Sequence, residues 1–376
     1  MKGKLALCFA LLAAAAFSPL HVSAAAPQVS AKAAILVNAD DGSVLYAKNE
    51  HEHLAIASTT KIMTSLLALE AASADDKTVT ITPEMIRVEG SSMYLHAGDR
   101  LTLRDLAAGM LAVSGNDAAN AAAIAVSGTT DRFADRMNEK AAMLGMKDTH
   151  FVTPSGLDDA EHYSSASDMA VLARAALQND DFAAIVRQKS LKVHFLNPDE
   201  TRSYINHNKL LSLYPCCTGI KTGFTSKAGR CLVSSAEKDG VRLIAVTLSD
   251  PNDWNDHEEL LDYGFSRLRS LPIDDSGFQA EANVVGGVRA SVAVTGTKGV
   301  DAVVGADAEL QLTVELPRFV YAPVRAGEVL GSVRYDCDGK TVARTDIIAV
   351  RDVGCAVMPK NWFQVFWSGL LSLLSG

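Results

Sequence analysis

The sequence contains little that would suit nucleic acid, a metal ion or a membrane span. Its 35 Lys and Arg are outnumbered by 44 Asp and Glu, and the net charge of −9 leaves no basic face for nucleic acid. No low-complexity linker and no array of repeats occurs. The apolar stretch at each end of the chain is short for a transmembrane helix. With 48% hydrophobic residues, the chain has enough apolar side chains for a sizeable packed core.

Cysteine is scarce as well, with six in 376 residues, and no pair has the C-x-x-C spacing of a redox motif or a zinc site. Either the cysteines are buried or idle thiols, or Cys216 or Cys217 bridges to Cys231. The segment His51-Glu52-His53 has two imidazoles but no evident third ligand, so no metal site is predicted. Without Cys8, which lies in the leader described next, an odd number remains: Cys216, Cys217, Cys231, Cys337 and Cys355.

The N-terminus predicts a secretory signal peptide over residues 1–25. Lys2 and Lys4 form a positive start, residues 5–17 are apolar, and residues 23–26 offer small side chains for cleavage. A buried N-terminal helix is the alternative, but the order of these regions fits export better. Export would leave about 350 residues, enough for one large domain and one smaller domain. We therefore expect an exported protein, at the outer face of the cytoplasmic membrane or in the cell wall or periplasm.

Residues 26–272 predict an α+β domain. A turn at residues 40–42 between two short apolar segments predicts a hairpin over 33–46. Because strands are expected at both ends of this region and helices in the middle, the hairpin should join the later strands in one antiparallel sheet with a helical cluster. Helical spacing is found at 58–70, 103–110, 117–126, 132–144, 168–177 and 257–268, and strand patterns at 220–222, 231–234 and 243–248.

Two further segments follow this domain. Short alternating runs with turn signals over 276–352 predict a small all-β domain at residues 273–356. Residues 357–376 predict an amphipathic membrane-anchor helix, since polar residues recur every three or four positions and apolar residues cover the rest. The amphipathic stretch itself runs from Asn361 to Gly376, and a helix of about 16 residues is short for a span and suits the membrane surface. The alternative is a terminal helix docked on the protein.

Three short motifs occur in order along the chain. Residues 58–61 read Ser-Thr-Thr-Lys, residues 114–116 read Ser-Gly-Asn and residues 221–223 read Lys-Thr-Gly. Each alone is a weak signal, and a second S-x-x-K occurs at Ser235 to Lys238. That copy runs from a predicted strand into a turn, so its two side chains should not share a face. Together the three motifs supply a nucleophile, an amine base, a proton shuttle and an anion clamp, which suits attack on an amide carbonyl.

Ser58 is the predicted nucleophile and Lys61 the predicted base. Residues three apart on a helix lie on one face, so the amine can reach the hydroxyl. Burial and a nearby cation such as Lys221 would lower the pKa of Lys61 and make the amine a base at neutral pH. Ser114 is expected to relay a proton between Lys61 and the leaving amine, and Asn116 to orient Lys61. Alone, the motifs at 58 and 114 would equally suit helix caps.

The third motif is assigned to substrate binding. Lys221 and Thr222 are expected to clamp a carboxylate, and Gly223 to leave room for a peptide that pairs as an added strand. The N–H groups of Phe224 and Ser58 are expected to form an oxyanion hole. Alone, this motif would suit an ordinary exposed strand edge.

The chain resembles the serine D-alanyl-D-alanine carboxypeptidases, the low-molecular-mass penicillin-binding proteins, over nearly its whole length. The resemblance implies a penicillin-binding/β-lactamase-like transpeptidase domain that forms an acyl-enzyme on its serine. The implied reaction is release of the terminal D-alanine from peptidoglycan stem peptides. β-Lactam antibiotics would acylate the same serine, and no metal or organic cofactor is implied. Besides the three motifs, the segments that carry the resemblance are residues 156–159, 162–166, 168–170 and 208–211, the β domain and the terminal helix.

The sequence departs from this family in one respect. Some members carry an arginine after the strand that follows the K-T-G strand, where it helps bind the substrate carboxylate. The comparable residues 250–257 contain no arginine. The carboxylate clamp is therefore expected to rest on Lys221 and Thr222.

Two other functions fit part of the pattern. A β-lactamase of the same superfamily would carry the E-x-x-L-N pattern of the class A deacylating glutamate, which is absent, and the β domain and terminal helix do not fit it. A murein-binding or penicillin-sensing module with a silent site is disfavoured because every expected catalytic side chain is present. Steady release of D-alanine from a pentapeptide would separate both from a carboxypeptidase.

Overall fold

The structure, a computed structural model, describes residues 25–356 together with 366–367 and 370–371. The signal peptide expected at 1–25 and the helix expected at 357–376 lie almost wholly outside the described residues. Within the described part of the chain, no helix is both long enough and apolar enough to cross a membrane.

The N-terminal hairpin joins the three later strands in one antiparallel sheet, as the sequence predicts. Every residue of its first strand is buried because both faces of the sheet are covered. Ile35 and Val37 pack toward the helical cluster, and Leu36 belongs to a second buried cluster on the other face, together with Leu260 of a helix. The expected α+β class is confirmed. The strand order is β2 (Val44–Lys48), β1 (Ala33–Asn38), β9 (Val241–Leu248), β8 (Gly229–Lys238), β7 (Cys217–Thr225).

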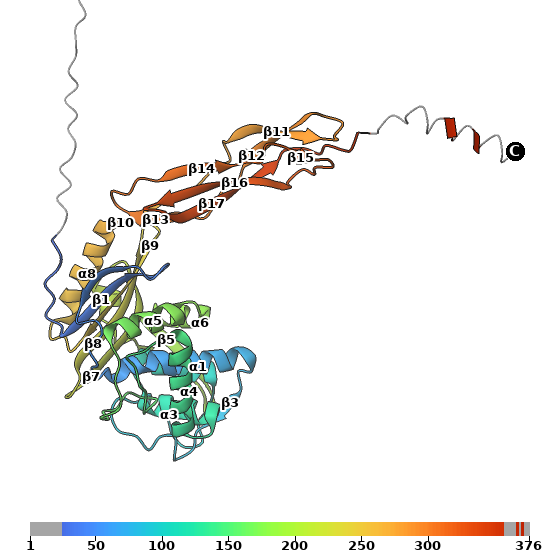
Figure 1. Ribbon diagram of the computed structural model, residues 1–376. Coiled ribbons are helices and arrows are strands. Elements are labelled where there is room, and N and C mark those ends of the chain that lie inside the picture. The colour runs from blue at the N-terminus through green and yellow to red at the C-terminus, as the bar shows by residue number, and fades with distance from the viewer. Residues whose placement is uncertain (1–24, 357–365, 368–369, 372–376) are drawn as a thin grey trace, which may run out of the picture.

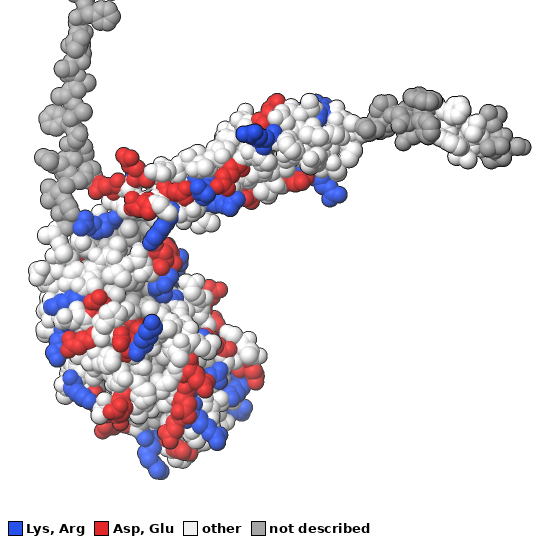
Figure 2. Space-filling model, in the orientation of Figure 1, with Lys and Arg blue, Asp and Glu red and all other residues white. Residues whose placement is uncertain are grey.

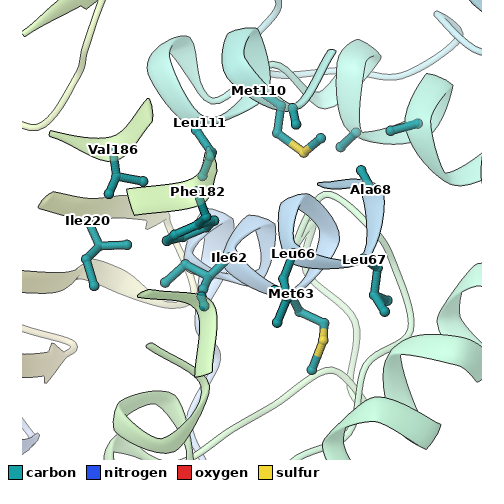
Figure 3. Packing of buried hydrophobic residues seen from close by; sticks show 14 of the residues in the cluster. Ile62, Met63, Leu66, Leu67, Ala68, Met110, Leu111, Phe182, Val186 and Ile220 are labelled. Atoms are coloured by element: carbon teal, nitrogen blue, oxygen red, sulfur yellow. The ribbon is translucent and has the colours of Figure 1, made fainter. Parts of the chain in front are cut away.

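Helix α1 (Lys61–Ala74) forms the centre of the helical cluster. Every side chain from residue 61 to residue 69 is buried, so this part of the helix has no solvent-facing side. Figure 3 shows Ile62 and Leu66 of α1 among Leu111, Phe182 and other buried side chains from neighbouring elements. This packing fixes the start of α1, where the first motif lies. The other helices of the cluster are α2 (Leu103–Val113), α3 (Asn116–Ser127), α4 (Thr130–Leu144), α5 (Ala166–Leu177) and α6 (Asp180–Val186), and α8 (Asp253–Arg267) covers the opposite face of the sheet.

The structure corrects the sequence interpretation in several places. The helix expected from residue 58 is a 3₁₀ turn, η1 (Ala57–Thr60), followed by the α-helix from Lys61. Helix α8 begins at residue 253, four positions before the predicted start. Several short elements were not predicted because their patterns are short and mixed. They are the pairs β3 (Thr78–Thr80) with β4 (Arg100–Thr102) and β5 (Ser190–Leu196) with β6 (Asp199–Ile205), and the helices α6 and α7 (Leu210–Leu213).

The C-terminal part forms an elongated β arm that extends away from the α+β domain (Figure 1). Strand β10 (Leu268–Leu271) already pairs with β13 (Ala302–Gly305) just before the expected boundary at 273. Figure 2 shows acidic and basic side chains interspersed over the drawn face of both parts, with no continuous basic patch there. The main sheet of the arm has the order β14 (Gln311–Glu315), β16 (Val329–Cys337), β17 (Lys340–Ala349), β12 (Ser291–Gly296), β11 (Gln279–Val285), β15 (Val320–Tyr321).

The five described cysteines are all free thiols. The possible bridge from Cys217 to Cys231 is wrong for a geometric reason. Cys217 pairs with Ala236 at one end of the β7–β8 hairpin, whereas Cys231 pairs with Gly223 near the other end. Five residues of extended strand separate the two positions by roughly 17 Å, far beyond the reach of a disulfide. Cys216, the other candidate, is the neighbour of Cys217 and lies just before β7.

Candidate active site

All three motifs contribute to one cavity of about 320 Å³. The first motif comes from the turn before α1, the second from the end of α2, and the third from the edge strand β7. A cavity of this size suits part of a peptide or a small ligand. Its lining residues are Ser58, Ser91, Ser114, His207, Lys209, Thr222, Gly223, Phe224, Arg230, Asp253 and Trp254.

The amine of Lys61 lies 2.9 Å from the hydroxyl oxygen of Ser58. It also lies 2.7 Å from Oδ1 of Asn116 and 2.6 Å from the carbonyl oxygen of Ser155. The side-chain amide of Asn116 donates from Nδ2 to the carbonyl of Glu89, which fixes Oδ1 toward Lys61. The last two contacts of Lys61 are therefore to groups that only accept. A neutral amine has two N–H groups and one lone pair, so its lone pair is left for the proton of Ser58.

The surroundings of Lys61 favour this neutral form. The side chain is completely buried, and burial lowers its pKa well below the usual value, with a further contribution from the charge of Lys221. Asp117 acts in the opposite direction but more weakly. Burial also lowers the pKa of Lys221, to about 7. The predicted influence of burial and of the neighbouring cation on Lys61 is confirmed.

Ser114 lies at the end of α2 in the left-handed backbone conformation, with φ of 60°. This conformation turns the chain sharply, so that α3 can begin at Asn116 and direct its amide to Lys61. Ser114 lines the cavity, and among the described residues its hydroxyl has no hydrogen-bond partner. It is therefore available to a substrate group. Asp117, which follows Asn116, accepts the N–H groups of Met93 and Leu95 and so holds the loop at the cavity wall.

Two glycines allow other segments to approach the nucleophile turn. A Cβ atom on Gly223 would lie 3.0 Å from the backbone nitrogens of both Ser58 and Thr59. The sequence interpretation, that Gly223 leaves room for a substrate strand, assigned this space to the wrong neighbour, since the protein's own backbone occupies it. Gly156 has a φ of +80°, and a side chain there would overlap the carbonyl of Ala57. Strand β7 and the loop at 156 therefore pack closely around Ser58.

A buried histidine fixes the same turn from behind. Nδ1 of His162 accepts the N–H groups of Val152 and Thr153, so its proton is on Nε2. Nε2 then donates to the hydroxyl of Thr60 at 2.8 Å, and that hydroxyl donates to the carbonyl of Ala57 at 2.8 Å. Burial lowers the pKa of His162 to about 4, so the imidazole stays neutral at physiological pH. The chain of hydrogen bonds holds the turn that carries Ser58.

Comparison with known proteins agrees with this geometry. Residues 20–252 match the family model described as D-alanyl-D-alanine carboxypeptidase. The chain belongs to this family. It is 34% identical over 337 residues to the D-alanyl-D-alanine carboxypeptidase DacF of Bacillus subtilis, which covers 86% of each chain. It is 32% identical over 357 residues to DacC of Escherichia coli K12, which covers 87% of this chain and 85% of the relative.

Solved structures show the same fold. Penicillin binding protein 5 from Haemophilus influenzae aligns with a TM-score of 0.64 and 30% identity, over 88% of this chain and 99% of that one. The Streptomyces K15 DD-transpeptidase aligns with a TM-score of 0.61 and 30% identity, over 65% of this chain and all of that one. The protein is thus a serine D-alanyl-D-alanine carboxypeptidase of the penicillin-binding class, a hydrolase of the cell wall. The β-lactamase and silent-module alternatives are not favoured.

Several residues of this carboxypeptidase's site were not found from the sequence. The carbonyl of Ser155 belongs to no motif, because a backbone acceptor leaves no trace in residue type. His207, Lys209 and Arg230 all line the cavity, yet only Lys209 lies in a segment that carried the family resemblance. The hairpin register could have located Arg230, since β8 places it directly opposite Phe224. Antiparallel pairing of the two predicted strands that follow residue 219 would have placed this arginine at the site.

The other candidate positions lie away from the catalytic cavity. Strand β8 contains both Ser235 and Lys238, which are three residues apart and so point to opposite faces, as expected. His51 and His53 both contact the carboxylate of Asp148, at 3.0 and 3.2 Å. These hydrogen bonds, that of His53 first, lower the pKa of Asp148.

Proposed function

We propose that Ser58, Lys61, Ser114 and Asn116 perform the carboxypeptidase reaction in the catalytic roles assigned from the sequence. Ser58 attacks the carbonyl carbon of the penultimate D-alanine, and its proton passes to the amine of Lys61. The observation that supports this most directly is the position of the Lys61 amine, which lies 2.9 Å from Ser58 Oγ while Asn116 Oδ1 and Ser155 O accept its N–H groups. Penicillin and related β-lactams would react with the same hydroxyl.

The tetrahedral intermediate then collapses in the same cavity. Its oxyanion accepts the N–H groups of Ser58 and Phe224. The C–N bond breaks, and a proton passes through the free hydroxyl of Ser114 to the leaving amine of D-alanine. Water attacks the resulting ester of Ser58, with Lys61 again taking the proton, and the shortened stem peptide leaves. Lys221, Thr222 and Gly223 form the strand edge beside which the substrate lies.

Two measurements test these roles. Purified protein is incubated with a pentapeptide that ends in D-Ala-D-Ala, and free D-alanine is measured over many turnovers. Labelled penicillin is then offered to the wild type and to Ser58→Ala, with Ser235→Ala as the control from the second S-x-x-K copy. We expect labelling of the wild type and of Ser235→Ala only. Stable labelling of Ser58→Ala, or one turnover without further release, would contradict the assignment.

We propose in addition that the protein is exported and held at the membrane surface. This proposal rests on the signal-like residues 1–25 and on the apolar pattern at 357–376, with a catalytic domain at 26–272 and a β domain at 273–356 between them. Because few basic residues flank the terminal segment, binding should depend on apolar burial and resist salt. Vesicle flotation of the mature chain and of a chain without residues 361–376 tests this. Flotation of the truncated form, or release of the full chain by salt alone, would refute it.

A further inference from the structure

Arg230 brings a guanidinium into the catalytic cavity from outside the three motifs. We propose that Arg230 binds the terminal carboxylate of the substrate and is the specificity-determining residue of this carboxypeptidase, with Asp253 and Trp254 as its positioning residues. The proposal rests on the function proposed above and refines it, because the sequence assigned this task to Lys221 and Thr222.

The hairpin places Arg230 beside the substrate edge. It lies on β8 opposite Phe224, two residues beyond Thr222 along the edge strand β7. Side chains two apart on a strand, and side chains directly opposite on neighbouring strands, share one face of the sheet. Arg230 therefore stands on the same face as Thr222 and Phe224, and all three line the cavity with Ser58.

Two neighbours hold the guanidinium in one orientation. Oδ1 of Asp253 accepts from Nε of Arg230 at 2.9 Å and from Nη2 at 2.7 Å. The ring of Trp254 lies 5.3 Å from the guanidinium carbon. Asp253 is itself buried and accepts the N–H of Trp254 at the start of α8, so it cannot easily move. An arginine has five N–H groups in a planar fork. Asp253 uses one side of this fork, and the Nη1–Nη2 end remains for a second carboxylate.

Lys221 is poorly placed to bind a carboxylate by charge. Lys221 is completely buried, and its amine donates to the carbonyl oxygen of Thr222 at 2.9 Å. Burial lowers its pKa to about 7, so much of its charge is lost near neutral pH. A guanidinium remains protonated throughout this range. The side chain of Arg230 is 41% exposed, which keeps the charge solvated while it faces the cavity.

Arg230 can take the place of the arginine that some family members carry after the strand following the K-T-G strand. Residues 250–257 contain no arginine, but they contribute Asp253 and Trp254, the two residues that hold Arg230. The cation thus comes from β8 and its support from α8. His207 and Lys209 also line the cavity. Burial lowers the pKa of His207 and favours its neutral form, which leaves Lys209 as the cation to compare experimentally.

The test compares two substrates on the intact mature protein. One peptide ends in D-Ala-D-Ala with a free carboxylate, and the other ends in the C-terminal amide. Arg230→Gln should lower kcat/KM for the carboxylate peptide by on the order of 10-fold, mainly through KM, and leave the amide peptide nearly unchanged. Arg230→Lys should restore part of the loss because it keeps the charge but not the fork. Asp253→Asn should show the same substrate dependence with a smaller loss.

The controls separate this inference from the proposed function. Arg242→Gln removes another arginine of the same sheet, one paired with Asp40 outside the cavity, and should leave both substrates unaffected. An equal fall on both substrates in Arg230→Gln, or loss of discrimination in Lys209→Gln instead, would overturn the role of Arg230. If the wild type releases no D-alanine from the carboxylate peptide, the proposed function itself fails.

Discussion

Gly223 offers the most direct test of how the site is assembled. A Cβ atom there would stand 3.0 Å from the backbone nitrogens of Ser58 and Thr59 and from the carbonyl oxygen of Ile56. These are backbone atoms of the nucleophile turn, so none can rotate away as a side chain would. Gly223 does not have a positive φ, and alanine suits an extended strand there. Gly223→Ala therefore changes the three contacts with the nucleophile turn and little else.

The size of the effect follows from the distances. Ordinary Cβ contacts begin near 3.4 Å, so the turn or strand β7 has to move by about 0.4 Å. Displacement of about 1 Å in a reacting group can lower a rate about 10²-fold. We expect acylation of Ser58 to slow by roughly 10-fold in Gly223→Ala. The overpacked contact should also lower the free energy of unfolding by about 1–3 kcal/mol.

The assay is the rate of labelling by a fluorescent penicillin, followed together with urea unfolding. Gly277→Ala is the matched control, because a Cβ atom there meets nothing within 4 Å and the backbone has no positive φ. It should label and unfold like the wild type. If Gly223→Ala labels at the wild-type rate, the close packing of β7 on the turn does not position Ser58. The argument would also fail if Gly223→Ala lost labelling only because a larger fraction of the protein was unfolded.

Three further predictions concern the buried basic side chains Lys61, Lys221 and His257. Lys61→Ala should fold and acylate about 10²- to 10⁴-fold more slowly, as measured by penicillin labelling; near-normal rates would exclude Lys61 as the base. Because the charge of Lys221 helps to lower the pKa of Lys61, Lys221→Met should raise that pKa and shift the acidic limb of the acylation profile to higher pH; a shift to lower pH would contradict the coupling. Burial lowers the pKa of His257 from 6.5 to about 3, so its neutral form stabilises the fold above pH 6.5 and this contribution falls as the pH drops toward 3. Between pH 6.5 and 5 the free energy of unfolding should fall by about 2 kcal/mol from this group. Urea titrations should therefore show that the stability of His257→Gln depends less on pH than that of the wild type. An equal pH dependence in both proteins would contradict this assignment.

The sequence predicted those parts of the site in which residue type and spacing carry the information. A serine and a lysine three residues apart lie on one helical face, and burial of the lysine was expected from its role as a base. The antiparallel sheet followed from strands at both ends of the domain. These predictions needed only the local sequence pattern and the rule that strands of one domain pair in a common sheet.

What the sequence could not provide were contacts between segments without periodicity. The carbonyl of Ser155 and the hydrogen bonds from His162 through Thr60 depend on how one loop crosses the start of α1. Gly223 was assigned to the site, but the space beside it is filled by the nucleophile turn, and a missing side chain does not indicate which neighbour fills its space. Arg230 was not predicted because the family's arginine lies at another position along the chain, whereas strand register brings Arg230 opposite Phe224.

The cations of the site are divided by burial into two kinds. Lys61 and Lys221 are almost completely excluded from water, and burial lowers the pKa of both. For Lys61 this exclusion creates the base, because a lone pair is available only when the amine is neutral. The same exclusion makes the amine of Lys221 a poor partner for a carboxylate, because an ion pair requires the charged form of the amine. Arginine does not lose its proton on burial, and Arg230 is moreover partly exposed and paired with Asp253. A site that must both remove a proton and bind an anion at one pH therefore needs a cation outside the buried pair, and Arg230 meets that requirement.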